Sequence, residues 1–293
     1  MRRREILGIM AGMASVAGMA SVAGLTNLGR FPSGSATVQA DDSRNIPLPR
    51  MDLHVHRDGT TLDKLLEISA AKGVRFGIVE HAGTKENQYP VILSNDEELR
   101  AYLATMEGKP CYRGVQAEWL DWTSCFSKEA LLELDYVLGD AMTVPGPDGK
   151  RSKLWLDYDF GEPEAFMDMY AEFHVELIHS QPLDILANPG WLPEQFANPE
   201  ALWTEKRLTK IVDALVATQT ALELNSDYRL PCERMIAMAK EAGARFSFGT
   251  NIRGPKVGDI DFSLEMAKKY DITTVNLFVP GREPGAIERR LKR

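Results

Sequence analysis

Two histidines separated by a single residue are the feature of this sequence best suited to chemistry. His54 and His56 lie in the stretch Met-Asp-Leu-His-Val-His (51–56), where apolar and polar residues alternate as in a β-strand. Successive side chains of a strand point to opposite faces, so both imidazoles lie on one face. Two imidazoles placed in this way can bind one metal cation. The pair therefore predicts a metal or catalytic site at the end of this strand.

Polar residues also end the later apolar stretches of the chain. These residues are Glu80, His81, Glu118, Asn188, Asn225 and Asn251. In a parallel α/β barrel the C-terminal ends of the strands converge and the active site forms there. We therefore expect a metal or catalytic role for His54, His56, His81 and Glu118 together. His174 and His179 belong to a helical pattern and are expected to be structural or surface residues.

Short apolar stretches alternate with amphipathic ones along most of the chain, which is typical of βα units around a parallel sheet. The expected strands are 51–56, 75–80, 112–118, 135–139, 184–187, 221–225 and 245–249, with 274–278 as a further one. The expected helices are 62–72, 96–106, 164–179, 205–217 and 232–242. So many units in about 250 residues favour a closed α/β barrel over an open doubly wound sheet.

Two further patterns bear on the site. No glycine-rich phosphate loop follows a strand, which argues against nucleotide binding. The segment 143–161 has no clear element of its own, and long loops of this kind often form lids or pocket walls. Its aromatic residues, and Trp119, Trp122 and Trp191, either stack on a substrate ring or pack against the barrel rim.

The first 40 residues read as a leader. Arg2, Arg3 and Arg4 precede a run rich in glycine and alanine, and Val38 and Ala40 form a small-residue cleavage site. The pattern resembles a twin-arginine signal peptide. We expect a signal peptide over 1–40, a linker over 41–50 and the barrel over 51–293. The mature protein would be periplasmic or extracellular and would meet the membrane only during export. The alternative is an uncleaved anchor, because about 20 residues suffice to span a bilayer.

Composition narrows the partners. The chain has 293 residues, of which 44% are hydrophobic, enough for a sizeable core. Four of its 34 basic and one of its 42 acidic residues lie in the leader, which leaves 30 and 41 and a net charge of −11. Such a surface repels nucleic acid. Cys111, Cys125 and Cys232 form no CxxC pair and are expected to be small buried residues, with one disulfide left open after export.

Three segments of the sequence resemble the PHP (polymerase and histidinol phosphatase) superfamily. Asp-Leu-His-Val-His-Arg-Asp-Gly (52–59) looks like its first motif, Val-Glu-His (79–81) like its second, and Gly-Val-Gln-Ala-Glu (114–118) like its bridging-glutamate segment. The resemblance implies a distorted (β/α)7 barrel of TIM-like form. It also implies up to three divalent metals that activate water for hydrolysis, usually of phosphate esters.

The sequence departs from that family at four positions. Met142 and Asn188 stand where histidine ligands are usual, Asn251 replaces an acid, and Arg253 replaces a histidine. An amide oxygen carries no net charge to offset a divalent ion. A guanidinium instead brings a fixed charge with two-pronged geometry suited to phosphate or carboxylate.

With these departures, the resemblance implies a metal site that has fewer ligands than is usual in the family. It implies one cation (Zn, Mn or Fe) held by His54, His56 and Glu118 with the amide oxygen of Asn251. His81 and Asp58 then hold a weaker second ion or act as an acid–base pair.

Together these features predict an exported metal-dependent hydrolase, phosphoesterase-like, acting on a small anionic substrate. His81 and Asp58 are its expected catalytic residues, and Arg253, Asn188 and Asn225 its substrate-binding residues. The alternatives are a non-catalytic barrel that binds an anionic or sugar-like ligand, and a lyase or isomerase that needs no metal.

Overall fold

The computed structural model describes residues 47–291, apart from 147, 157, 197 and 255. The expected signal peptide (1–40) and most of the linker therefore lie outside the described residues. Within the described part of the chain, no helix is long and apolar enough to cross a membrane.

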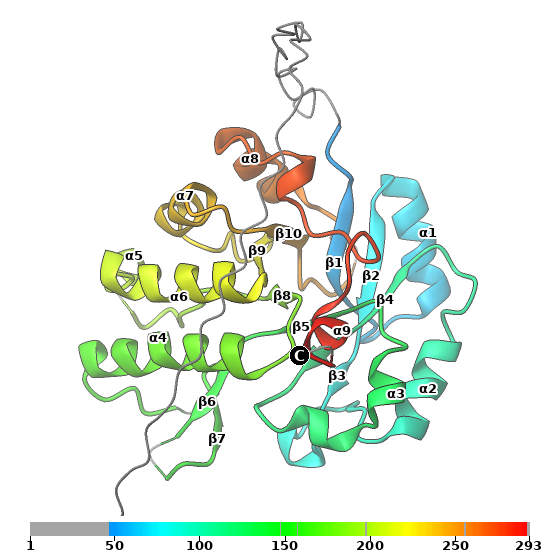
Figure 1. The fold of residues 1–293 in the computed structure, drawn as a ribbon, viewed down its shortest axis with the longest axis horizontal. Helices are drawn as coiled ribbons and strands as arrows, with labels where there is room; N and C mark the ends of the chain where they lie inside the picture. The colour runs from blue at the N-terminus through cyan, green and yellow to red at the C-terminus, as the bar shows by residue number, and fades with distance from the viewer. Residues whose placement is uncertain (1–46, 147, 157, 197, 255, 292–293) are drawn as a thin grey trace, which may run out of the picture. The chain divides into compact units, whose positions relative to one another are not determined.

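Seven parallel strands form a nearly closed barrel, as expected from the sequence (Figure 1). In their hydrogen-bonded order they are β1 (Met51–His56), β2 (Arg75–Val79), β4 (Tyr112–Ala117), β5 (Tyr136–Gly139), β8 (Ile185–Leu186), β9 (Ala221–Asn225) and β10 (Phe246–Gly249). The short strand β3 (His81–Ala82) follows β2 and also pairs with β4. Next to the end of β10, the backbone N–H of Asn251 donates to the carbonyl of His54 (3.0 Å). This bond brings the last strand against the first.

Helices surround the strands (Figure 1). The longer ones are α1 (Leu62–Lys72), α2 (Asp96–Ala104), α4 (Pro163–Ser180), α6 (Glu205–Thr218), α7 (Glu233–Glu241) and α8 (Asp261–Lys269); the short ones are α3 (Lys128–Leu131), α5 (Pro199–Leu202) and α9 (Ala286–Leu291). Side-chain caps determine where several begin, because the first N–H groups of a helix lack partners. Thr61 caps α1, Asn95 caps α2 and Thr204 caps α6.

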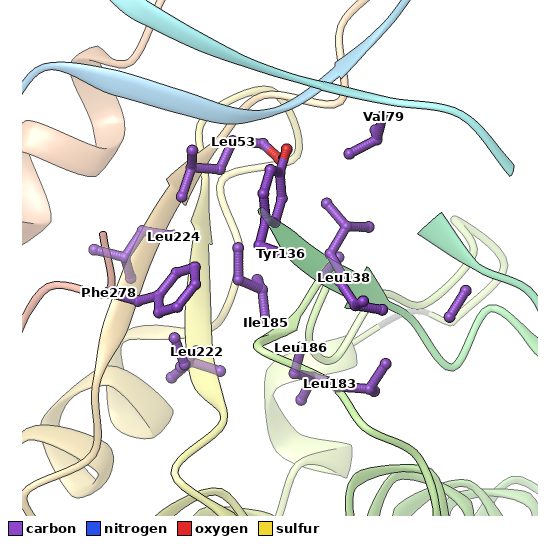
Figure 2. Packing of buried hydrophobic residues seen from close by; sticks show 14 of the residues in the cluster. Leu53, Val79, Tyr136, Leu138, Leu183, Ile185, Leu186, Leu222, Leu224 and Phe278 are labelled. Atoms are coloured by element: carbon purple, nitrogen blue, oxygen red, sulfur yellow. The ribbon is translucent and has the colours of Figure 1, made fainter. Parts of the chain in front are cut away.

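The barrel interior is filled by apolar side chains around Tyr136 (Figure 2). The Tyr136 hydroxyl donates to the carbonyl of Leu53 at 2.7 Å, so its polar end is satisfied inside the core. Glycines make room for the ring, because a Cβ at Gly114 would lie 2.5 Å from its Cζ atom. With the middle of the barrel apolar, the polar residues are left at the strand ends.

Three expectations from the sequence were wrong. Residues 274–278 are not a strand, since Thr274–Asn276 forms a 3-10 turn capped by Thr273, and only Leu277 bridges to β10. The segment 143–161 does contain an element, because β6 (Thr143–Pro145) and β7 (Arg151–Lys153) pair as an antiparallel hairpin. All three cysteines are free, and only Cys111 is buried, while Cys125 and Cys232 are partly exposed.

Candidate functional site

A cavity of about 290 Å³ opens at the end of the barrel where the strands terminate. We call it the pole cavity; its lining is Asp58, His81, Tyr89, Pro90, Gln116, Asp140, Met142, Trp155, Asn188, Trp191, Tyr228, Asn251 and Arg253. A larger cavity of about 550 Å³ lies at the opposite strand ends, beside Tyr112, Asp135 and residues 280–285. No histidine is among the described residues that line that one. The pole cavity is therefore the candidate site, in keeping with the general position of active sites in α/β barrels.

His54 lies at the centre of a buried hydrogen-bond network. Its Nδ1 is 2.8 Å from Glu223 Oε1 on β9, and its Nε2 is 3.1 Å from Gln116 Oε1 on β4. Burial lowers the pKa of His54, but the charge of Glu223 and its hydrogen bond outweigh burial, so the pKa is raised overall. Both ring nitrogens face acceptor oxygens, the pattern of an imidazolium that donates at both. His54 therefore has no nitrogen left for a metal in this arrangement.

Gln116 joins the two histidines of the first strand. Its Oε1 is also 2.9 Å from His56 Nε2, so one amide oxygen sits where the two imidazoles converge. His56 is buried, and its Nδ1 has no hydrogen-bond partner among the described residues. Burial and then repulsion from His81 and His54 hold the pKa of His56 well below its usual value. His56 is thus neutral with an unpaired buried nitrogen, which is the state that binds metal.

His56, Asp58 and His81 form the grouping best arranged to hold a cation. Each offers one ligand atom, and these atoms lie within 4.8 Å of one another. His81 Nδ1 is 2.7 Å from Glu118 Oε1, which leaves its Nε2 available. A carboxylate behind a ligating imidazole is the usual arrangement at zinc sites, because it orients the ring. The donor set of two imidazoles and one carboxylate fits one divalent ion.

The sequence grouped these residues differently. It put His54, His56, Glu118 and Asn251 on one cation, whereas Glu118 lies behind His81 and His54 is held by Glu223 and Gln116. Asn251 Oδ1 accepts a hydrogen bond from Arg253 Nη1 at 2.6 Å. That oxygen faces a positive group.

Amides and one carboxylate make up the wall beside these histidines. Asp140 Oδ2 accepts from Asn188 Nδ2 (2.8 Å) and Gln116 Nε2 (3.3 Å). Asn188 Oδ1 in turn accepts from Asn225 Nδ2 (3.0 Å) and more weakly from Asn251 Nδ2 (3.4 Å). Burial, and then the charge of Glu118, raise the pKa of Asp140 to about 6. Asp140 is thus a cavity-lining carboxyl group that titrates near neutral pH.

Arg253 brings the fixed positive charge expected from the sequence. Its Nε donates to Asp58 Oδ2 at 3.0 Å, and both groups are 40% exposed. Asp52, buried in β1, holds the loop that carries Arg253: it accepts from the Thr250 backbone N–H (3.0 Å) and hydroxyl (2.6 Å) and from Gly258 N–H (3.1 Å). The loop after β10 is thereby tied to the strand that carries His54 and His56.

Some residues of this site were missed at the level of sequence. Glu223 and Asp140 carried a usable signal: Glu223 is an acid inside the apolar stretch 221–225, and Asp140 directly follows a strand. Tyr89, stacked on His81 with ring centroids 3.7 Å apart, lies in a loop and gave none. Of the three tryptophans, Trp191 lines the pole cavity and Trp122 is fully buried in the core, while Trp119 packs against Phe173.

Comparisons with known proteins support the fold. No protein-family model matches the chain, and no curated protein matches it significantly. Among solved structures, it is similar to histidinol phosphate phosphatase from Lactococcus lactis subsp. lactis Il1403, crystallised with zinc, L-histidinol and phosphate. The TM-score is 0.60 at 15% sequence identity, over 83% of this chain and 99% of the other. The fold is therefore a distorted (β/α)7 barrel, TIM-like in form and similar to the barrel of this phosphatase.

Proposed function

We propose that this protein is a metal-dependent hydrolase, phosphoesterase-like, that acts on a small anionic substrate. The observation that carries the proposal is the cluster of His56, Asp58 and His81 at the pole cavity, with Glu118 behind His81. The similar barrel of a phosphatase crystallised with zinc and phosphate supports it at the level of fold.

Each residue has a defined part in this proposal. His56, Asp58 and His81 hold one divalent ion, for which zinc suits the two imidazoles better than magnesium does. When bound, such an ion polarises the substrate and lowers the pKa of water. Glu118 orients His81, and Arg253 attracts the anionic group to the side of Asp58.

Asp140 completes the proposed machinery as the group that takes up or releases a proton. A general acid or base works best when its pKa lies near the working pH, and burial brings the pKa of Asp140 to about 6. Asn188 orients it, and Asn225 orients Asn188.

One observation favours a second candidate, a barrel that binds an anionic ligand without turnover. Arg253 donates a hydrogen bond to Asp58, so one of the three proposed metal ligands already has a guanidinium as its partner. In that case the charge of Arg253 replaces the charge of a metal.

Metal content separates the two. The mature protein, purified without chelator and analysed for elements, should contain about one zinc, manganese or iron per chain. His56→Ala and His81→Ala should each lose it, because removal of one of three protein ligands sharply weakens binding. His179→Ala, which changes an exposed histidine of α4, is the matched control and should keep the metal. A metal-free parent that still binds phosphate would support the second candidate.

We further propose that the protein is exported and that its first 40 residues are removed. The proposal rests on the arginines and the small residues of the leader.

A further inference from the structure

Exposed aromatic side chains lie in the lining of the pole cavity. The large apolar side chains that are exposed among the described residues are Val91, Leu132, Trp155, Leu156, Val216, Tyr228 and Val275. Trp155 and Tyr228 line the cavity, and Val91 and Leu156 directly adjoin lining residues in sequence. Exposed apolar residues that gather in one place mark a binding surface, whereas single ones do not.

The aromatic rings at the mouth differ in how much of their surface is available. Tyr89 is half-buried, and its ring already has two neighbours, because the His81 ring stacks on it with centroids 3.7 Å apart and the Lys153 ammonium lies 3.9 Å from its centroid. Trp155 is 40% and Tyr228 44% exposed, and Trp191 is half-buried in the same lining. Ring surface for contact with a ligand therefore comes from the two tryptophans and Tyr228.

The floor of the cavity has the opposite character. It holds His81, Asp140 and Asn188, and Arg253 lies at its edge. The volume of about 290 Å³ admits a small ligand only. Since a cavity of about 150 Å³ holds benzene, there is room for one ring and one phosphate-sized group.

We propose that the site selects substrates in which a planar aryl ring carries the anionic group, with the anion at the floor and the ring between Trp155, Trp191 and Tyr228. The inference rests on the proposed function only for the identity of the anionic group. In this proposal the polar floor binds the anionic group of the ligand, and the aromatic side chains of the mouth contact its ring. Aromatic pairs gain stability beyond the area they bury, which favours an aryl ring over a saturated one.

Non-hydrolysable phosphonates test this selection without turnover. The mature protein is titrated calorimetrically with phenyl-, cyclohexyl- and methylphosphonic acid, once after chelation and once loaded with Zn²⁺. Phenylphosphonic acid should bind at least about ten-fold more tightly than the methyl compound, and also more tightly than the cyclohexyl compound. Trp155→Ala and Tyr228→Ala should each reduce the phenyl preference by about two- to ten-fold. Leu132→Ala, which removes an exposed apolar side chain at the opposite strand ends, should leave it unchanged.

Several results would overturn the inference: equal binding of the phenyl and methyl compounds, equal binding of the phenyl and cyclohexyl compounds, an unchanged preference in both variants, or no binding of phenylphosphonic acid by either form. The proposed function fails by a different result, namely a parent protein without metal or phosphatase activity. A protein that keeps the phenyl preference after chelation, but shows no phosphatase activity even when loaded with Zn²⁺, would retain the inference and refute the hydrolase.

Discussion

His174 provides a sharp test of the electrostatics in this structure. It is buried in the middle of α4, where its Nδ1–H donates to the carbonyl of Tyr170 (2.8 Å). Its Nε2 has no partner among the described residues, and its ring makes edge contacts with Tyr170 and Trp203. Burial lowers the pKa of His174 from 6.5 to about 4. A proton on this ring in the folded state is therefore strongly disfavoured.

The pKa of His174 predicts how its contribution to stability changes with pH. Between about pH 6.5 and pH 4 the unfolded chain binds a proton that the folded chain does not, so stability falls as the pH drops through this window. At 1.36 kcal/mol per pKa unit, the full loss is about 3.4 kcal/mol. Between pH 7 and pH 5 the same linkage gives a loss of about 1.8 kcal/mol.

His174→Phe should remove that loss. Urea unfolding of both proteins at pH 7 and pH 5 gives four free energies of unfolding. The variant should lose about 1.8 kcal/mol less than the parent between the two pH values. Any change in packing acts equally at both pH values and cancels. His179→Gln, which changes an exposed histidine on the same helix, should follow the parent. If His174→Phe shows the same pH dependence as the parent, His174 is not buried in a neutral state and the reasoning fails.

Three further predictions concern other parts of the chain. Gly249→Ala should lower the free energy of unfolding by about 1–3 kcal/mol in urea, because the added Cβ would lie 2.8 Å from Glu223 Cδ. Ser247→Ala in the same strand is the control and should cost less, since the Ser247 hydroxyl has no hydrogen-bond partner among the described residues. Arg253→Lys should weaken phosphate binding, measured by calorimetry, by about 1.5 kcal/mol. This is the lower end of the range for a hydrogen bond to a charged group, because the Arg253 side chain is 40% exposed. If the variant binds phosphate with equal affinity, Arg253 serves only as the partner of Asp58. N-terminal sequencing of exported protein should begin at Asp41, and recovery of the full-length chain in membranes would contradict the leader.

Local sequence patterns were sufficient to predict the barrel. Strands β1 and β9 have the expected bounds, because alternation of apolar and polar residues is a property of the strand itself. The polar residues at the strand ends are likewise visible in sequence, and parallel strands necessarily bring those ends to one pole. The failed strand at 274–278 shows the limit of such patterns, since a local cap at Thr273 turned an apolar stretch into a 3-10 turn.

Only the tertiary structure decided which side chains pair at that pole. His54 contacts Glu223, 169 residues away, and Arg253 contacts Asp58 across 195 residues. Gln116 from β4 reaches both imidazoles of β1, although β2 lies between these strands in the sheet. Spacing within a strand determines the face on which a residue lies. Which partner it meets across the barrel depends on how far the barrel closes and on the rotamers that packing allows, and neither is encoded within a single strand.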